Sequence, residues 1–322
     1  MDLSIVIVNW NSVDYLRACL TSVIRETHGI DYEVIVIDAA SFDGSDAMVR
    51  ATFPGVRFIQ GLKNVGFGLS NNRACEEARG DAILFLNPDT EVIGPAINDL
   101  LSALGRLPDA GAVGCRLLNT DGSLQTSCVQ AFPTIANQVL DTEWLREKWP
   151  ASRVWGTQAL YARDGTAQVV EGIAGACIMM RRAVFERVGG FSSDFFMYAE
   201  DIDLCHKVQA AGLRNYYLPQ ATIVHHGGGC SREAPSDFAV VLMRESIFRY
   251  LAKTHGRMYG QGYRAAMLGV ASVRLGLLGI GSLRDLFRPP ADGRSGSRRK
   301  WNAVLRWCVA RQATVRQFEP AA

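Results

Sequence analysis

The chain has 322 residues, 48% hydrophobic and 20% charged, a balance that excludes intrinsic disorder and is typical of a globular protein. Its net charge of +2 hides an asymmetry. Residues 1–248 hold 20 basic and 29 acidic side chains, whereas the remainder holds 14 Lys/Arg and three Asp/Glu. A basic C-terminal part on an acidic body indicates contact with something anionic, such as a membrane surface or nucleic acid.

The cysteines and the apolar segments bear on the cellular compartment. The eight cysteines are scattered without a Cys-x-x-Cys pair, which predicts reduced core thiols in a cytosolic protein. We expect no signal peptide, because the N-terminus enters a strand-like run without a basic leader. No window holds 18 uncharged apolar residues, so we expect no membrane-spanning helix.

Four short apolar runs in the first part of the chain are each followed by a polar turn. They predict buried strands at 3–8, 33–38, 56–59 and 82–86. Asn11 or Ser12 is the expected N-cap of the helix after the first strand. Four strand–helix units in about 100 residues predict a doubly wound α/β sheet, which binds ligands outside the carboxyl ends of its strands.

Polar residues stand at these strand ends and should converge on one crevice: Asn9, Asn11, Asp38 and Asp89. No Gly-x-Gly-x-x-Gly follows the first strand and no P-loop occurs, which disfavours a dehydrogenase or an NTPase. A bound nucleotide would instead be held by side chains and strand ends.

Asp89 follows the fourth strand and is a candidate metal ligand. A hard divalent cation on a diphosphate needs only one or two protein carboxylates, because phosphate oxygens and water supply the rest. The alternative is a turn aspartate that caps a helix starting near Gly94 and Pro95.

The periodicity weakens over residues 127–170, which we interpret as an insertion of loops and a short helix. Its aromatic residues could stack on a sugar face or form a satellite core, and the sequence leaves both open: Trp144, Trp149, Trp155 and Tyr161.

Residues 172–180 predict a strand whose small residues permit close approach of a ligand or another backbone. A short helix is expected at 181–188. Glu200, Asp201 and Asp203 then follow an aromatic run and open a helical pattern that ends at Gly212. Carboxylates beside an apolar wall tend to have raised pKa values, which suits general-base catalysis. The alternative is an ordinary first turn of a helix, where acidic residues favour the dipole.

Two further short strands, 215–218 and 221–224, lead to His225 and the glycines at 227–229. A histidine at a strand end with tight backbone clearance suits a metal ligand, although a single histidine is more often structural.

These motifs, in this order, resemble the inverting family 2 glycosyltransferases of the GT-A fold, most of all the bacterial rhamnosyltransferase-like members that act on cell-envelope polysaccharides. The resemblance covers roughly residues 3–250. It rests on Val8–Asn11, Asp38 with Asp43–Ser45, Asn64–Gly68 with Asn71 and Asn72, Asn87–Thr90, Phe195–Leu204, and His225 with the trailing glycines and Ser231.

The resemblance implies a fold and a division of the chain. It implies a Rossmann-like, mostly parallel sheet flanked by helices over residues 1–250. Residues 251–322 lie beyond the resemblance, and their own sequence predicts a basic, mainly helical extension that associates with a membrane or dimerises.

The resemblance also implies roles for individual residues. Asp201 matches the catalytic base that deprotonates the acceptor hydroxyl, with Glu200 and Asp203 orienting it or holding the acceptor. Asp89 and His225 match ligands of Mg²⁺ or Mn²⁺ on the nucleotide diphosphate. Asn87 stands where the metal motif often begins with Asp, and Ala39 stands where a base-contacting Asn or Asp is frequent, which leaves Asp38 or backbone groups for the base. The implied donor-binding residues are Val8, Asn9, Asn11, Asp38, Ser41, Gly66, Phe67, Asn71, Asn72, Asn87 and Asp89.

The implied reaction transfers a sugar with inversion from a nucleotide-sugar donor, preferably dTDP-rhamnose, to a hydroxyl of a glycan or lipid-linked glycan. UDP-hexoses, including UDP-galactofuranose, are alternative donors. A non-catalytic nucleotide-sugar-binding scaffold in a polysaccharide assembly complex is the rival from another class.

An apolar segment with arginines over 264–287, followed by basic residues at 294–300, indicates attachment to an anionic membrane surface. Glycines at 269, 276, 279 and 281 disfavour a helix there. The alternatives are a helical hairpin packed on the catalytic domain and a homodimer interface. We expect no nucleic-acid partner, because no recognised nucleic-acid motif surrounds the basic residues. The expected location is the cytoplasm, peripheral on the inner face of the cell membrane.

Overall fold

The computed structural model describes residues 1–162, 165–227, 236–285 and 294–310. Within it the chain divides into two compact units. The first comprises 1–132, 143–196 and 200–230, and the second comprises 133–142, 197–199 and 231–322.

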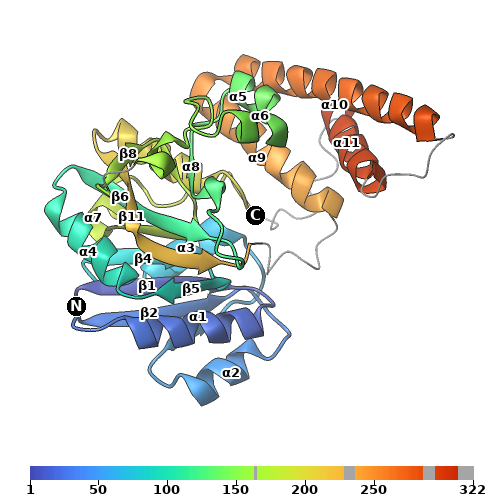
Figure 1. The fold of residues 1–322 in the computed structure, drawn as a ribbon. Helices are drawn as coiled ribbons and strands as arrows, with labels where there is room; N and C mark the ends of the chain where they lie inside the picture. Colours follow the sequence, from blue (N-terminus) through green and yellow to red (C-terminus); the bar gives the residue numbers. More distant parts are fainter. Residues whose placement is uncertain (163–164, 228–235, 286–293, 311–322) are drawn as a thin grey trace. The chain divides into compact units, whose positions relative to one another are not determined.

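The first unit is built on a nine-stranded sheet of order β3-β2-β1-β4-β10-β6-β11-β5, with β8 paired to β11 (Figure 1). Six strands run in one direction and β10, β5 and β8 run against them. The strands are β1 Leu3–Asn9, β2 Tyr32–Asp38, β3 Arg57–Gln60, β4 Ala82–Leu86, β5 Thr90–Ile93, β6 Ala110–Leu118, β8 Gln168–Val170, β10 Cys177–Arg181 and β11 Arg214–His225. A separate pair joins β7 Val129–Gln130 to β9 Gly172–Ile173.

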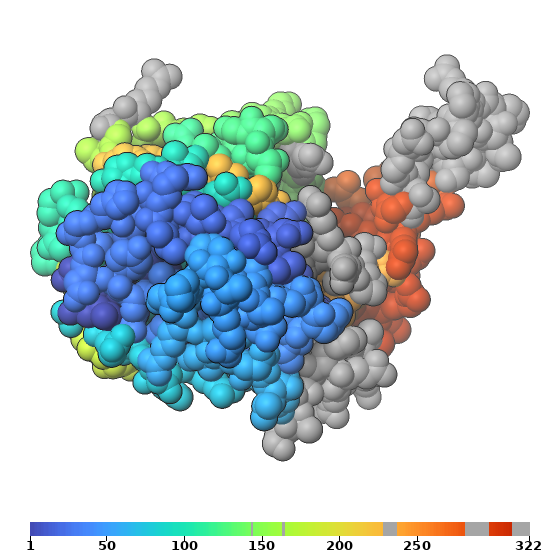
Figure 2. Space-filling view, turned by 90° about the horizontal axis from the view of Figure 1, so that it is seen from below, coloured from blue at the N-terminus to red at the C-terminus, as the bar shows by residue number. Residues whose placement is uncertain are grey.

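Helices flank this sheet, as the alternating strand–helix pattern predicted. In the first unit they are α1 Val13–Glu26, α2 Ser45–Thr52, α3 Phe67–Cys75, α4 Ala96–Arg106, α6 Glu143–Lys148, α7 Arg182–Arg187 and α8 Glu200–Ala210. Helix α3 packs on β1 and β2, whereas α4 packs on β6, β10 and β11. Residues 1–60 form much of the face seen in Figure 2.

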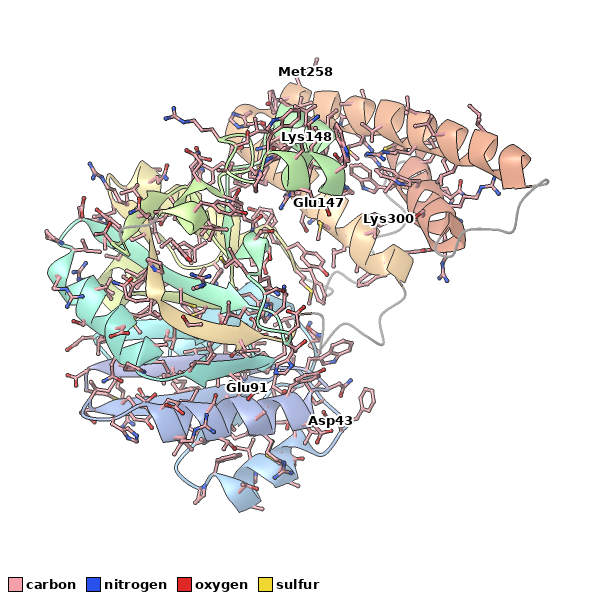
Figure 3. All side chains as sticks on the ribbon, viewed as in Figure 1. Asp43, Glu91, Glu147, Lys148, Met258 and Lys300 are labelled. Atoms are coloured by element: carbon pink, nitrogen blue, oxygen red, sulfur yellow. The ribbon has the colours of Figure 1, made fainter. Side chains whose placement is uncertain are left out.

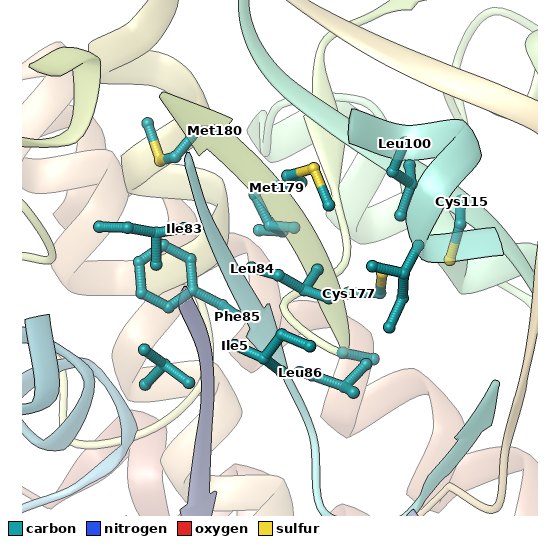
Figure 4. Packing of buried hydrophobic residues seen from close by; sticks show 14 of the residues in the cluster. Ile5, Ile83, Leu84, Phe85, Leu86, Leu100, Cys115, Cys177, Met179 and Met180 are labelled. Atoms are coloured by element: carbon teal, nitrogen blue, oxygen red, sulfur yellow. The ribbon is translucent and has the colours of Figure 1, made fainter. Parts of the chain in front are cut away.

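The core lies where the central strands meet the flanking helices. Ile5, Phe85 and Met179 come from adjacent strands β1, β4 and β10 and are fully buried (Figure 4). The continuous apolar runs predicted strands buried on both faces, and these strands are buried along nearly their whole length. The seven described cysteines are all free thiols, as predicted, and Cys230 lies outside the described residues.

Two local predictions were wrong, and a third was correct only in part. The expected strand at 172–180 is two strands, β9 and β10, because Ala174–Ala176 leave the sheet between them. The two short strands expected at 215–224 are one strand, β11, whose register shifts between Leu218 and Thr222. Ser12 is the N-cap residue of α1, but its side chain makes no capping hydrogen bond. Ser12 Oγ donates to Asn9 Oδ1, and the carboxylate of Asp43 accepts the Val13 N–H at 2.8 Å.

The second unit is helical, with α5 Ile135–Leu140, α9 Ser236–His255, α10 Arg257–Asp285 and α11 Arg294–Val309. The glycines do not interrupt α10, which contradicts the prediction from helix propensity. The helix packs along α5, α9 and α11, and this packing offsets the low propensity of glycine.

One stretch of α10 also bears on the expectation about membrane spans. Arg257–Ile280 has a mean hydropathy of 1.3 and is 17% buried, so it is long and apolar enough to cross a membrane by length and composition alone. Core helices of soluble proteins can pass the same test.

Candidate active site

Asp38 lies at the carboxyl end of β2 and is 1% exposed. Its Oδ1 accepts hydrogen bonds from Asn9 Nδ2 at 2.7 Å and Ser41 Oγ at 2.6 Å. Its Oδ2 accepts from the Ser41 N–H and from Gln60 Nε2, both at 2.8 Å. These four bonds fill the usual acceptor capacity of a carboxylate. The Asp38 side chain is therefore committed to holding the ends of β1, β2 and β3 together.

The loop after β2 is tied to the loop after β1. Asn11 accepts the Phe42 N–H at 2.9 Å and donates its own N–H to Ser41 Oγ at 2.9 Å. Asn11 has φ 46°, a left-handed conformation that asparagine tolerates better than most residues. Phe42, next to these hydrogen bonds, is 82% exposed. Val8, the remaining predicted donor residue of β1, pairs with Ile37 in the same register as Asn9 with Asp38.

The predicted donor residues around α3 hold loops in place. Gly66 has φ 89°, and a side chain there would collide with the Phe196 carbonyl, which also accepts the Phe67 N–H at 3.0 Å. Asn72 clasps the Phe191 backbone, donating to its carbonyl at 2.8 Å and accepting its N–H at 2.9 Å. Asn71 Oδ1 is buried and has no hydrogen-bond partner among the described residues, so this acceptor is open to a ligand.

The two predicted metal ligands lie side by side. Asp89 follows β4 and His225 ends β11, and their Oδ1 and Nε2 atoms are 3.3 Å apart. Backbone pairing sets this distance, because Thr90 is the register partner of His225 and the His226 N–H donates to the Asp89 carbonyl at 2.9 Å. The neighbouring His226 bonds Glu91 at 2.7 Å; Glu91 is labelled with Asp43 in Figure 3.

This pair offers a carboxylate oxygen and an imidazole nitrogen, donors that Mg²⁺ or Mn²⁺ accepts. In the part of the chain that the structure describes, no group of three or more His, Cys, Asp and Glu side chains could hold a metal ion. The pair supplies at most two protein ligands, so a cation bound here would take its other ligands from a diphosphate and water. The trailing residues Gly228–Ser231 lie outside the described residues.

Glu200 and Asp201 open helix α8, and their surroundings differ. Asp201 Oδ2 accepts the Gly175 N–H at 2.8 Å, and its Oδ1 accepts the Ile202 N–H at 2.8 Å. Glu200 is 6% exposed, and its Oε2 has no hydrogen-bond partner among the described residues. Burial, reinforced by the charge of Asp201, raises the pKa of Glu200 to about 8. Burial also raises the pKa of Asp201, while its two backbone N–H bonds oppose that rise.

The segment directly before β10 connects the acidic pair to the metal pair. Gly175 binds Asp201, and the next residue, Ala176, accepts the Asn87 N–H at 3.0 Å. Asn87 is two residues from Asp89. The segment Gly175–Ala176 therefore places the Asp201 carboxylate and the Asp89–His225 pair along the same edge of the sheet.

Asp203 is bonded inside the first unit. It is 1% exposed, accepts from Ser192 Oγ at 2.5 Å and lies 3.8 Å from Lys207 Nζ. The backbone directly before α8 is strained, since Tyr198 and Ala199 have φ of 69° and 64°. Left-handed non-glycine residues cost about 1–3 kcal/mol each and cluster at functional sites.

The aromatic residues of the insertion divide into two groups. Trp155 is buried and its Nε1 donates to the Trp149 carbonyl at 3.0 Å, which favours the satellite-core interpretation for this residue. Trp144 and Trp149 are 62% and 52% exposed, and the Lys148 ammonium lies 5.0 Å and 5.2 Å from their ring centres.

Sequence reasoning missed two residues of this site. The sequence indicates Gly175 only as one of the small residues of a strand, although its N–H donates to Asp201. Gln125, bonded to His225 at 2.7 Å, gave no signal, because its partner is 100 positions away.

A mostly parallel sheet with donor-side loops at its carboxyl ends and an acidic helix start beside them defines a glycosyltransferase of the GT-A fold. A mannosyltransferase from Pyrobaculum calidifontis, solved with GDP-Man and Mn²⁺, superposes with a TM-score of 0.59 at 17% identity over 95% of this chain and 86% of that one.

The chain belongs to glycosyl transferase family 2, whose model matches residues 4–189, and a model for family group 2 matches 141–266. It is an enzyme of this class. It is 29% identical to an N-acetylglucosaminyl-diphospho-decaprenol L-rhamnosyltransferase of Mycobacterium tuberculosis over 88% of this chain and 94% of that protein. It is also 29% identical to the rhamnosyltransferase WbbL of Escherichia coli K12, over 77% and 92% of the two chains.

Proposed function

We propose that this enzyme transfers rhamnose from dTDP-rhamnose, with inversion, to a hydroxyl of a lipid-linked glycan in cell-envelope polysaccharide synthesis. One observation carries the chemistry: Gly175–Ala176 joins a carboxylate suited to deprotonate an acceptor to a cation-binding pair at the strand ends. The names of the two rhamnosyltransferase relatives support the sugar and the acceptor class.

In this mechanism Asp201 takes the proton of the acceptor hydroxyl. Two backbone N–H groups hold the carboxylate in one orientation and favour its ionised form, whereas its partial burial keeps it basic. General-base catalysis of this kind contributes about 10²–10⁴-fold to the rate. Glu200, protonated up to about pH 8, would donate a hydrogen bond toward the acceptor or toward Asp201. Asp203 would hold the helix start through Ser192 and Lys207.

Asp89 and His225 would hold Mg²⁺ or Mn²⁺, which when bound stabilises the charge on the departing nucleoside diphosphate. Asn71, with its open acceptor, would bind a hydroxyl of the donor. Because Asp38 is saturated by protein donors, backbone groups of the loop after β2 would recognise the base.

The donor assignment is tested by a thermal-shift screen of nucleotide sugars with and without Mn²⁺. Stabilisation by dTDP-rhamnose above UDP-hexoses and UDP-galactofuranose supports the proposal, since at equal concentration the ligand with the lower Kd stabilises the folded protein more. A larger shift with a UDP-sugar would contradict the assignment of dTDP-rhamnose and identify the UDP-sugar as the donor instead. Metal-dependent donor hydrolysis, absent with a chelator, would exclude the scaffold alternative.

The helical unit suits a lipid-linked acceptor at the inner face of the membrane. One face of α10 is exposed and apolar, through Met258 (labelled in Figure 3), Leu268, Val273, Leu277 and Ile280. On α11, Arg298, Arg299 and Lys300 are exposed. An apolar face with nearby cations binds anionic interfaces.

Co-sedimentation with vesicles containing anionic lipid tests this attachment on the full chain. Val273→Glu with Leu277→Glu should abolish binding, while a matched pair on the exposed surface of α2, Asp46→Ala with Arg50→Ala, should not. Concentration-dependent dimerisation that the same α10 double variant removes would favour the homodimer interface instead.

A further inference from the structure

A chain of side-chain hydrogen bonds runs from the turn at 119–123 to the candidate metal ligand His225. Ser123 Oγ donates to Asp121 at 2.6 Å and lies 2.9 Å from Asn119 Nδ2. Gln125 Nε2 donates to Asn119 Oδ1 at 3.1 Å, and Gln125 Oε1 lies 2.7 Å from His225 Nδ1.

The direction of every bond in this chain is fixed from its outer end. An ionised carboxylate only accepts, so the Ser123 hydroxyl must give its proton to Asp121 and accept from the Asn119 amide nitrogen. That orients the Asn119 carbonyl toward Gln125, whose amide nitrogen must donate. The Gln125 carbonyl oxygen is therefore the atom that faces His225, and the proton between them belongs to Nδ1.

The backbone makes the turn a firm support. The Asn119 N–H donates to the Ser123 carbonyl at 2.8 Å, and the Gln125 N–H returns to the Leu117 carbonyl at 2.9 Å. Leu117 and Leu118 in turn pair with Ile223 and Val224 of β11, which carries His225. Gln125 and His225 thus come from two segments that are both hydrogen-bonded to β6.

In a neutral imidazole with its proton on Nδ1, Nε2 carries a bare lone pair. That lone pair faces Asp89 Oδ1 across 3.3 Å, which is an arrangement suited to a cation. The other tautomer would give Nε2 a proton, and this proton would bond the Asp89 carboxylate and occupy both groups.

We propose that Gln125 is a positioning residue that holds His225 in the Nδ1–H tautomer and so keeps its Nε2 lone pair for a divalent cation bound beside Asp89. The inference rests on the metal site of the proposed function. Outer hydrogen-bond partners of metal-binding histidines change metal affinity by about 10–100-fold when they are lost.

The test has two readouts on the full-length protein. Long-range ¹H–¹⁵N correlation spectra of ¹⁵N-histidine-labelled, metal-free protein, at a pH where His225 is neutral, report its tautomer. Electron paramagnetic resonance of Mn²⁺ titrated in the presence of dTDP reports metal affinity. Gln125→Leu should convert His225 to the Nε2–H form and raise the Mn²⁺ dissociation constant about tenfold. Gln125→Glu keeps an acceptor and should preserve both, and Gln168→Leu on β8 is the matched control.

A wild-type His225 in the Nε2–H form, or an unchanged tautomer in Gln125→Leu, overturns the proposal. A tautomer that switches as expected in a protein that binds no Mn²⁺ with dTDP upholds the role of Gln125 on His225 and overturns the metal site itself. Loss of both readouts in Gln125→Glu as well as Gln125→Leu would also count against it, because the carboxylate retains the acceptor.

Discussion

Asp38 and Glu200 are both buried carboxylates of the first unit, 1% and 6% exposed, yet they differ in what surrounds them. Asp38 accepts four hydrogen bonds from Asn9, Ser41 and Gln60. Glu200 has an oxygen without a partner among the described residues and a pKa raised to about 8. A saturated carboxylate stabilises loops, whereas an unsaturated one costs stability and remains available to a ligand. In the proposed function, the donor side of the site would therefore be rigid, and the acceptor side would hold the groups that exchange protons.

Among the predicted variants, Asp201→Asn has the largest expected effect on kcat. Asp201→Asn should lower kcat by about 10³-fold, because the amide cannot accept the acceptor proton. The amide oxygen can still accept one of the two backbone N–H bonds, so the thermal shift produced by dTDP-rhamnose should be nearly unchanged. Steady-state kinetics and thermal shifts measure the two effects, with Asp46→Asn on exposed α2 as the control. Near-normal turnover would remove Asp201 from the role of base.

Asp38→Asn tests the saturated side. The amide places an NH₂ group against donors that Asp38 now satisfies, so the free energy of unfolding should fall by about 3 kcal/mol. Urea denaturation of the variant and of Asp46→Asn measures this. A stable Asp38→Asn protein that has lost only donor binding would show that Asp38 serves the nucleotide rather than the loops.

The sequence predicted the frame of this site because the frame depends on short-range patterns. Apolar runs placed β1, β2 and β4, and the polar residues after them fell at one edge of the sheet, as strand geometry requires. The sequence predicted Asp89 and His225 as members of one site, and the two side chains lie 3.3 Å apart.

What the sequence did not predict depends on distant partners. Ser12 is the N-cap residue of α1, but the Asp43 carboxylate rather than the Ser12 side chain accepts a hydrogen bond at the helix start, since the β2 loop folds back over it. The glycines of α10 stay helical because α9 and α11 pack against that helix. The saturation of Asp38 requires Gln60, which is 22 positions away.

Glu200→Gln tests the unsaturated side through pH. The folded pKa of about 8 lies above the ordinary value of 4.5. Between these values the unfolded chain has lost a proton that the folded chain keeps, so wild-type stability falls as pH rises through this window. Below pH 4.5 this penalty is absent, and above about pH 8 it is complete. Glu200→Gln should remove this pH dependence and be about 5 kcal/mol more stable than wild type at pH 8.5, with little difference at pH 4.5. Denaturant curves at both pH values measure it, and parallel pH profiles for the two proteins would contradict the assignment.

Gly175→Ala has the smallest expected effect, and it tests the position of the Asp201 carboxylate without changing its chemical group. A methyl group at Gly175 would lie 3.3 Å from Asp201 Cβ and 3.5 Å from its Oδ2, tight enough to move the carboxylate by a few tenths of an ångström. Gly175→Ala should lower kcat by about tenfold, because a small displacement of a catalytic group is costly in rate. The substitution removes neither the carboxylate nor its N–H donor, so the thermal midpoint should stay within about 3 °C of wild type. Gly105→Ala, where a methyl group meets nothing within 4 Å, is the matched control. The segment Gly175–Ala176 joins Asp201 to the metal pair. A kcat that is unchanged in Gly175→Ala would therefore mean that the position of the Asp201 carboxylate in the reaction does not depend on this segment.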